Sequence, residues 1–165
     1  MNDTISFILN GEAVTWSGNL AARLLDALRL DFKNTGVKCG CKEGECGACA
    51  VLLDGMLINS CMTAMGRVDG SQVITIEGYK KTNRFAALNK AFAAAGASQC
   101  GFCTPGMIMA AEALLSINPN PSEADVRIGI SGNLCRCTGY NAIVNAILAA
   151  AKEGKGLWQS KYLTA

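Results

Sequence analysis

The sequence predicts an α+β protein in which a small mixed half is followed by an all-helical half. Alternating apolar residues and Gly-containing turns indicate two hairpins and a further strand before residue 79. From Asn83 onward the strand pattern is lost, and apolar residues recur at helical spacing. We therefore predict one domain over residues 1–79, a helical domain over 84–155 and a C-terminal tail over 156–165.

The first half is expected to hold two hairpins, one helix and a last strand. "ISFILNGEAVTWS" alternates apolar and polar residues around Asn10-Gly11, a pair that favours a two-residue turn. "AVLLDGMLINS" repeats this pattern around Asp54-Gly55, and a final strand is expected over 72–78. The helix between the hairpins should bury one apolar face: Leu20, Leu24, Leu25 and Leu28.

The second half should begin with two helices separated by a loop. Phe85, Leu88 and Phe92 mark the first helix, and Gly96 closes it as the residue after the C-cap. The second helix should begin with Thr104 as N-cap and Pro105 as its first residue, and the prolines at 119 and 121 end it.

Two further helices and a tail complete the predicted second half. Ser122 and Asp125 form a variant of the capping box at the start of a helix that Gly132 ends. The fourth helix covers 140–155 and should bury one face: Ile143, Val144, Ile147 and Ala151. The tail carries Trp158 and Tyr162 without periodicity, which we interpret as a segment that lies on a partner.

Composition and charge exclude several classes of protein. The net charge is only +2 and Lys/Arg runs do not exceed two residues, so we expect neither a nucleic-acid partner nor a polybasic membrane anchor. The apolar runs are far shorter than the roughly 18 residues of a membrane span. The N-terminal stretch "MNDTISFILNGE" lacks the basic and apolar regions of a signal peptide, so we expect a cytoplasmic protein.

Cysteine and histidine usage points to thiolate metal sites. There are nine cysteines, an odd number, in a chain for which we expect a reducing compartment, so a disulfide scaffold is disfavoured. Histidine is absent, which excludes His-ligated zinc, Rieske-type clusters and Ser-His-Asp catalysis within this chain.

Four of the cysteines form what we call the first thiol set. Their C-x4-C-x2-C…C spacing is the plant-type arrangement for a 2Fe–2S cluster. Three glycines in the same loop, Gly40, Gly44 and Gly47, allow the backbone to approach an anionic cluster closely. The set consists of Cys41, Cys46, Cys49 and Cys61.

Four more cysteines form the second thiol set. A C-x2-C pair and a C-x-C pair each lead into a predicted helix, whose N-terminal N–H groups and dipole favour thiolates. Spacing alone leaves a tetrathiolate zinc site open for this set. Its members are Cys100, Cys103, Cys135 and Cys137, which leaves Cys39 as the spare cysteine of the chain.

Three long motifs resemble the small iron–sulfur subunit of molybdenum hydroxylases: "VKCGCKEGECGACAVLLDG", "SQCGFCTPGMIMAAEALL" and "GNLCRCTGYNAIVNAI". This family includes xanthine dehydrogenase, aldehyde oxidoreductase, molybdenum-type carbon monoxide dehydrogenase, nicotinate dehydrogenase and 4-hydroxybenzoyl-CoA reductase. The resemblance implies a ferredoxin-like β-grasp domain and a four-helix-bundle domain, each with one 2Fe–2S cluster on its thiol set. It also implies that Gln99 contacts, and Cys137 approaches, the pterin of a molybdenum cofactor, while the first cluster lies toward FAD.

The chain departs from the family pattern at two positions. Lys42 stands where relatives usually have glycine, and Cys39 where they commonly have a polar residue. A charge at Lys42, or at Arg136 between two predicted ligands, would favour the reduced state of the nearby cluster; the alternative is a solvated surface side chain.

The resemblance implies an electron relay and not the site of substrate chemistry. Single electrons would pass between a large molybdopterin subunit and a medium FAD subunit, with a dimer of heterotrimers as the expected assembly. Two alternatives are a free-standing ferredoxin-like carrier and a zinc-binding interaction module. We expect no catalytic residue in this chain.

Overall fold

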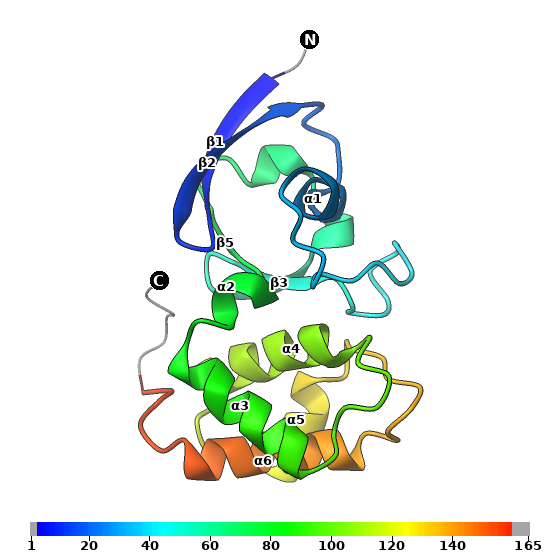
Figure 1. Ribbon diagram of the computed structural model, residues 1–165, viewed down its shortest axis with the longest axis vertical. Coiled ribbons are helices and arrows are strands. Elements are labelled where there is room, and N and C mark those ends of the chain that lie inside the picture. Colours follow the sequence, from blue (N-terminus) through cyan, green and yellow to red (C-terminus); the bar gives the residue numbers. More distant parts are fainter. Residues whose placement is uncertain (1–2, 160–165) are drawn as a thin grey trace.

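Residues 3–159 are described by the computed structural model of the chain (Figure 1). A five-stranded mixed sheet forms the first half, with strand order β2-β1-β5-β3-β4. The strand β1 pairs in parallel with β5 and antiparallel with β2, and β3 pairs antiparallel with both β4 and β5. The strands are β1 (Asp3–Leu9), β2 (Glu12–Gly18), β3 (Ala50–Leu53), β4 (Met56–Asn59) and β5 (Gln72–Ile74).

Both predicted hairpin turns are confirmed. Leu9 pairs with Glu12 and Leu53 pairs with Met56, so each turn has two residues. In each turn the two central residues have positive φ, at 54° and 89° for the first and 50° and 80° for the second. Asn-Gly and Asp-Gly pairs tolerate this left-handed geometry, which matches the twist of the flanking strands.

A short helical segment covers one face of the sheet, as predicted, but it is less regular than expected. It consists of α1 (Leu24–Asp26) and one π-helical stretch over Ala27–Asp31. Leu24, Leu25 and Leu28 are fully buried against the strands, whereas Leu20 lies before the helix. The predicted apolar face is therefore right for three of its four leucines.

The strand predicted over 72–78 is wrong in its second half. The strand β5 ends at Ile74, and the helix α2 occupies Ile76–Tyr79. The reason is local, because the hydroxyl of Thr75 accepts a hydrogen bond from the backbone N–H of Glu77 and caps the new helix. The 3₁₀ segments Ser60–Met62 and Met65–Arg67 connect β4 to β5.

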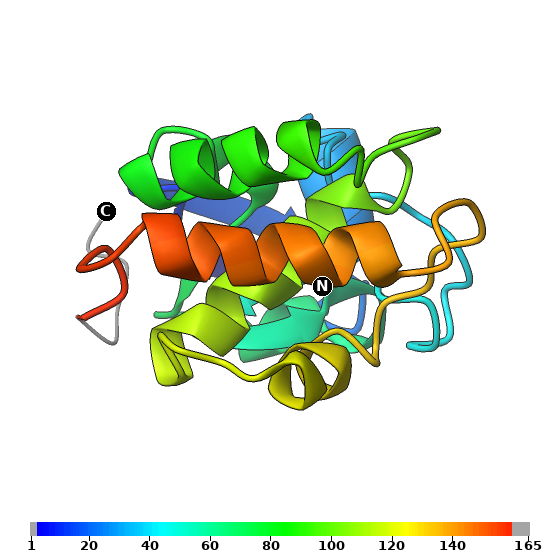
Figure 2. The same ribbon diagram turned by 90° about the horizontal axis from the view of Figure 1, so that it is seen from below.

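Four helices form the described part of the second half. Figures 1 and 2 show how they pack on one another. The helices are α3 (Asn83–Ala94), α4 (Thr104–Ile117), α5 (Glu123–Gly129) and α6 (Asn141–Glu153). Gly96 follows α3 with φ 60°, as predicted for a C′ glycine. The predicted N-cap of α4 is displaced by one residue, because Cys103 is the N-cap and Thr104 already belongs to the helix.

The capping box of α5 is confirmed in both directions. The Ser122 hydroxyl accepts from the N–H of Asp125, and the Asp125 carboxylate accepts from the N–H of Ser122. The helix ends at Gly129 and not at Gly132 as predicted, because the chain turns at Ile130 toward the cysteine loop. All four residues predicted to face inward on α6 are buried.

The two halves share one packed interface through β3, which is buried on both faces. Val51 and Leu53 belong to the core beneath α1. Ala50 and Leu52 belong to the other core, which they share with α4 and the remaining helices. In Figure 1, α4 lies directly against the sheet, and α3, α5 and α6 lie beyond it.

One buried carboxylate joins four segments of the chain. Glu112 on α4 accepts hydrogen bonds from the Tyr79 hydroxyl at 2.6 Å and the Arg84 guanidinium at 2.7 Å. Burial, followed by the negative charge of Glu112, raises the pKa of Tyr79. The Ser116 hydroxyl and the Trp158 indole N–H, each at 2.7 Å, complete the set of donors.

Trp158 corrects the prediction for the tail. It is 2% exposed and packs in the helical core of its own chain, because its indole N–H reaches the Glu112 carboxylate. The interpretation of this residue as a partner contact is wrong. Tyr162 lies outside the described residues.

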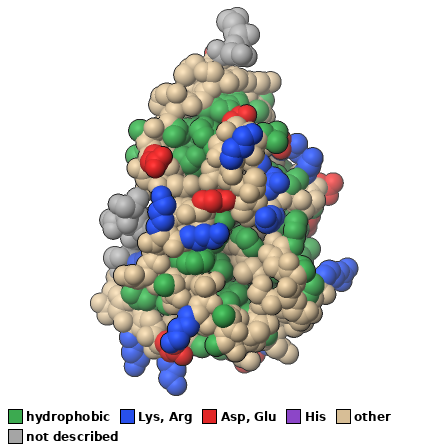
Figure 3. All heavy atoms as spheres, viewed as in Figure 1, with side chains coloured by type: hydrophobic (Ala, Val, Ile, Leu, Met, Phe, Trp, Pro, Cys, Tyr) green, Lys and Arg blue, Asp and Glu red, His purple; other side chains and the backbone are tan. Residues whose placement is uncertain are grey.

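The surface is mixed in character. On the face shown in Figure 3, Lys and Arg side chains are interspersed with acidic and hydrophobic ones. Within residues 3–159, the helices are too short or too polar to cross a membrane.

Candidate metal centres

The first thiol set is formed by a tight loop and the turn after β4. Two of the predicted loop glycines have positive φ, 81° at Gly44 and 64° at Gly47. At Gly40 the requirement is space, because a Cβ there would lie 2.7 Å from the Cys46 sulfur. The three glycines therefore let the loop fold closely around its sulfurs, as predicted from the sequence.

Backbone N–H groups point at the outer sulfurs of this set. The N–H groups of Glu43 and Cys46 each donate to the Cys41 sulfur, and the N–H of Cys41 donates to the Cys46 sulfur, all at 3.4 Å. These donors, that of Glu43 first, lower the pKa of Cys41 to about 7. The loop thus favours the thiolate form of Cys41 before any metal binds.

The other two thiols of the set are buried and touch each other. Cys61 lies in the 3₁₀ turn after β4 and contacts Cys49. Burial, and then the Cys49 thiol, raise the pKa of Cys61 to about 11. Asn59 supports this pair, since its carbonyl oxygen lies 3.9 Å from the Cys49 sulfur and its amide donates to the Gly44 carbonyl at 2.8 Å.

Cys39 and Lys42 lie beside this centre. Cys39 stands two residues before Cys41 in the sequence, and it packs against the apolar core beneath α1. Lys42 is exposed and has φ 64°, a conformation that glycine adopts more readily.

The second thiol set joins the loop before α4 to the loop before α6. The sulfurs of Cys100 and Cys137 lie 3.6 Å apart. Cys103 and Cys135 contact each other further inside. The structure therefore brings together all four cysteines that the sequence grouped.

The two thiols of the inner pair of the second set differ in pKa. Burial, and then the Cys135 thiol, raise the pKa of Cys103 to about 12. Burial also opposes ionisation of Cys135, but the Thr138 hydroxyl at 3.1 Å and the N–H groups of Cys137 and Thr138 lower its pKa to about 7. In this pair the thiolate of Cys135 is favoured over that of Cys103, and a positive metal centre would stabilise both thiolates.

The outer end of the second set opens to the surface. Cys100, Cys137 and the predicted pterin contact Gln99 are exposed. Two large apolar side chains flank them, Phe102 at 47% and Leu134 at 56% exposed.

The paired arrangement fits a binuclear cluster. Across residues 3–159, no three His, Cys, Asp or Glu side chains converge closely enough to hold one metal ion. A tetrathiolate zinc ion needs four sulfurs around a single point. A 2Fe–2S cluster needs two pairs, one for each iron, and each set provides two contacting pairs with N–H donors that favour anionic sulfur.

The two cysteine loops touch each other. The backbone N–H of Leu134 donates to the Cys46 carbonyl at 3.0 Å. Next to it, the amide of the buried Asn133 donates to the Gly47 carbonyl at 2.9 Å. The two sets are therefore linked through residues adjacent to their cysteines.

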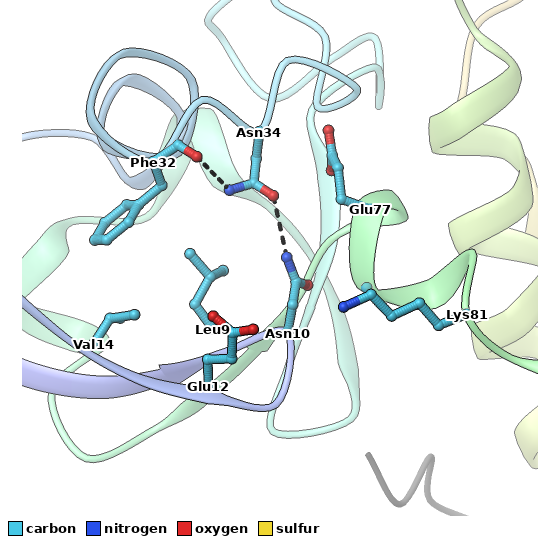
Figure 4. Close-up of a pocket in the computed structure, with 9 residues that line it drawn as sticks. Leu9, Asn10, Glu12, Val14, Phe32, Asn34, Glu77 and Lys81 are labelled. Carbon is cyan, nitrogen blue, oxygen red and sulfur yellow. Dashed lines mark hydrogen bonds between the residues drawn. The ribbon is translucent and has the colours of Figure 1, made fainter.

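A separate cavity of about 280 Å³ lies between the first hairpin and α2 (Figure 4). The Asn10 amide at its edge donates to Asn34 at 3.1 Å and to Thr75 at 3.0 Å. These bonds hold the hairpin turn against the start of α2. None of the predicted site residues lines this cavity.

Four residues that support the thiol sets were not predicted from the sequence. Thr138 donates to the Cys135 sulfur, and the Tyr140 hydroxyl accepts from the Cys135 N–H at 3.0 Å. Both belong to the motif "CRCTGY", so their proximity to two cysteines was a usable signal. Asn59 and Asn133 each stand two residues before a predicted ligand, but the carbonyls to which they donate, at Gly44 and Gly47, are distant in sequence.

Each thiol set belongs to a half of the chain that matches a known iron–sulfur domain. Residues 7–72 match a 2Fe-2S iron-sulfur cluster binding domain, and residues 75–148 match a second 2Fe-2S binding domain. The nicotinate dehydrogenase small FeS subunit of Eubacterium barkeri is 48% identical over 150 residues, covering 91% of this chain and 96% of the relative.

Solved structures show the same architecture. Quinoline 2-oxidoreductase from Pseudomonas putida 86 superposes with a TM-score of 0.86 and 41% identity, covering 92% of this chain and 94% of the other. Aldehyde oxidoreductase from Desulfovibrio gigas also gives a TM-score of 0.86, with 42% identity, but only 18% of its longer chain is matched.

These matches confirm the predicted α+β fold, a ferredoxin-like domain followed by a helical iron–sulfur domain. The two matched domains and the two thiol sets also confirm two 2Fe–2S clusters as the cofactors of the chain. The chain belongs to the small iron–sulfur subunits of the molybdenum hydroxylases, and it is an electron-transfer component of an oxidoreductase.

Proposed function

We propose that this chain passes single electrons between a molybdopterin site on a large partner subunit and FAD on a medium partner subunit. The observation that carries the proposal is that two four-thiol sets lie on loops in direct contact within one chain. Two adjacent one-electron centres suit a relay between cofactors that handle electron pairs.

The proposed ligands follow from the pairs. In the first set, Cys41 and Cys46 would hold one iron and the buried pair, Cys49 and Cys61, the other. A bound 2Fe–2S cluster supplies reversible one-electron chemistry. The loop N–H groups of Glu43 and Cys46 would stabilise the anionic sulfur and so influence the reduction potential.

In the second set, Cys100 and Cys137 would hold the outer iron, while Cys103 and Cys135 would hold the inner one. The Thr138 hydroxyl would donate to the ligand sulfur of Cys135 in the same way as the backbone donors of the first set.

The outer pair of the second set would face the molybdopterin subunit. It is exposed, and Gln99 beside it offers a free amide for a pterin, the role that the sequence resemblance implies. Phe102 and Leu134 provide an apolar rim on which a partner would pack. The proposed assembly is a cytoplasmic dimer of heterotrimers.

Metal analysis of the purified complex tests this function. We expect four irons per copy of this chain, with acid-labile sulfide and two distinct EPR signals after reduction with dithionite. Large molybdenum-containing and medium flavin-containing subunits should co-purify with it. Zinc in place of iron, with no visible absorption, would contradict the proposal.

A further inference from the structure

Asn133 joins the two cysteine loops, although it is neither a cysteine nor a neighbour of the first thiol set in sequence. Its side chain is 4% exposed, and its amide donates to the carbonyl of Gly47, which lies between Cys46 and Cys49. Its own backbone N–H is bonded to the Ile130 carbonyl at 2.9 Å. The hydrogen bond from its side chain to the Gly47 carbonyl thus links the two loops.

The contact leaves no room for additional atoms. A Cβ on Gly47 would lie 2.4 Å from the Gly132 carbonyl oxygen and 2.5 Å from the Asn133 amide nitrogen. A Cβ on Gly106, in the first turn of α4, would lie 2.5 Å from the Gly47 carbonyl oxygen. Three elements that carry or adjoin cysteines thus meet backbone to backbone.

The same contact closes a short route between the two sets. The Cys46 carbonyl accepts from the N–H of Leu134, and Leu134 is bonded covalently to Cys135. From the Cys46 sulfur to the Cys135 sulfur the path is covalent except for this one hydrogen bond. Electronic coupling falls more slowly through covalent and hydrogen bonds than across a van der Waals gap.

We propose that Asn133 is a positioning residue for electron transfer. Its amide holds the loops together so that the hydrogen bond from Leu134 to Cys46 forms and carries electrons between the two centres. The inference rests on the proposed relay function. Each crossing moves one electron, so the donor centre is oxidised by one electron and the acceptor reduced by one, and no bond forms or breaks.

The test uses the complete complex with Asn133→Leu, which keeps the size and branching of the side chain but removes its donor. We expect both clusters to remain, as judged by iron, sulfide and their separate EPR signals. The spin–spin splitting between the two dithionite-reduced clusters should be smaller than in wild type, and electron exchange between them should be slower in rapid-freeze experiments. Asn89→Leu, at an exposed position of α3, is the matched control and should behave as wild type.

Unchanged splitting and exchange in an Asn133→Leu complex with both clusters would overturn the inference and leave the relay function intact. A wild-type complex without iron would instead overturn the relay function. If Asn133→Leu loses a cluster, Gly106→Ala decides, because it pushes on the Gly47 carbonyl while keeping Asn133. Reduced splitting in that variant supports the inference, whereas unchanged splitting or a lost cluster there overturns it.

Discussion

At the scale of single residues, the two thiol sets obey the same electrostatic rule. Each contains a cysteine whose pKa is lowered to about 7 by hydrogen-bond donors, Cys41 and Cys135, and one whose pKa is raised by desolvation, the buried Cys61 and the half-buried Cys103. Without metal, full ionisation would place several negative charges in contact. The hydrogen-bond donors thus favour ionisation of one cysteine in each set, and iron binding would favour ionisation of the others.

The spare cysteine provides the sharpest test of ligand assignment. We expect Cys39→Ser to keep the full iron content, since Cys39 packs on the apolar core, and Cys41→Ser to lose the first cluster. Iron and sulfide analysis with EPR measures both. Iron loss in Cys39→Ser would overturn the division into three loop ligands and one bystander.

The left-handed backbone at Lys42 gives a second prediction. Because φ is 64° there, Lys42→Gly should relieve strain and stabilise the chain by about 0.5 kcal/mol after the entropic cost of glycine. Thermal unfolding measures the change, and Lys42→Ala, which keeps the strain, should show no gain. A shift of the reduction potential of the first cluster in both variants would show that the charge of Lys42 tunes that potential.

At the scale of elements, local side-chain capping fixes where α2, α3 and α5 begin. The capping box of α5 was predictable because Ser122 and Asp125 act within one turn of chain. We expect Ser122→Ala to destabilise the protein by about 1 kcal/mol, since the N–H of Asp125 loses its acceptor. Denaturant unfolding measures this loss, and an unchanged midpoint would show that water replaces the cap.

Two predictions at this scale were wrong, each for its own physical reason. "QVITIEG" has the composition of a strand, but the hydroxyl of Thr75 caps a helix after Ile74, and this choice also depends on bonds to the distant Asn10. The irregular segment around α1 keeps its leucines buried, so tertiary packing determines its geometry more than periodicity does. The hairpin turns and the end of α3 at Gly96 were predictable because their backbone geometry is encoded in two or three residues, whereas Gly132 lies beyond the end of α5.

The site was predictable to a similar degree. Cysteine spacing predicted which thiols the structure brings close together, because each set follows a short loop pattern. The division of each set into pairs, and the supporting roles of Asn59 and Asn133, depend on contacts across the fold. Such contacts leave no periodic signal in a single sequence.

At the scale of the whole molecule, the Glu112 carboxylate ties the C-terminal segment to the helices. Trp158→Phe keeps most of the packing but removes one donor to a buried charge, so we expect a loss of about 1.5–3 kcal/mol. Unfolding of the cluster-loaded chain measures it. Trp16→Phe is the matched control, because its indole donates to Asp31 at an exposed site and should matter much less.

Association with partners gives the last prediction. Phe102→Asp should weaken binding to the molybdopterin subunit while leaving the iron content unchanged, because a charge would replace an exposed aromatic ring beside the second thiol set. Analytical size-exclusion with iron analysis measures both properties. Ile117→Asp, at an 81% exposed position at the far end of α4, should assemble normally. Equal assembly of both variants would place the partner elsewhere.

The burial of β3 on both faces makes the two halves difficult to separate or exchange. Ala50 and Leu52 are side chains that an independent ferredoxin would have to expose to water, whereas here they lie against the helical half. A recombination event between residues 79 and 83 would join two halves with unmatched apolar faces. The packing of the two halves is therefore coupled, and a change of side-chain size on one face of this interface disturbs the other face.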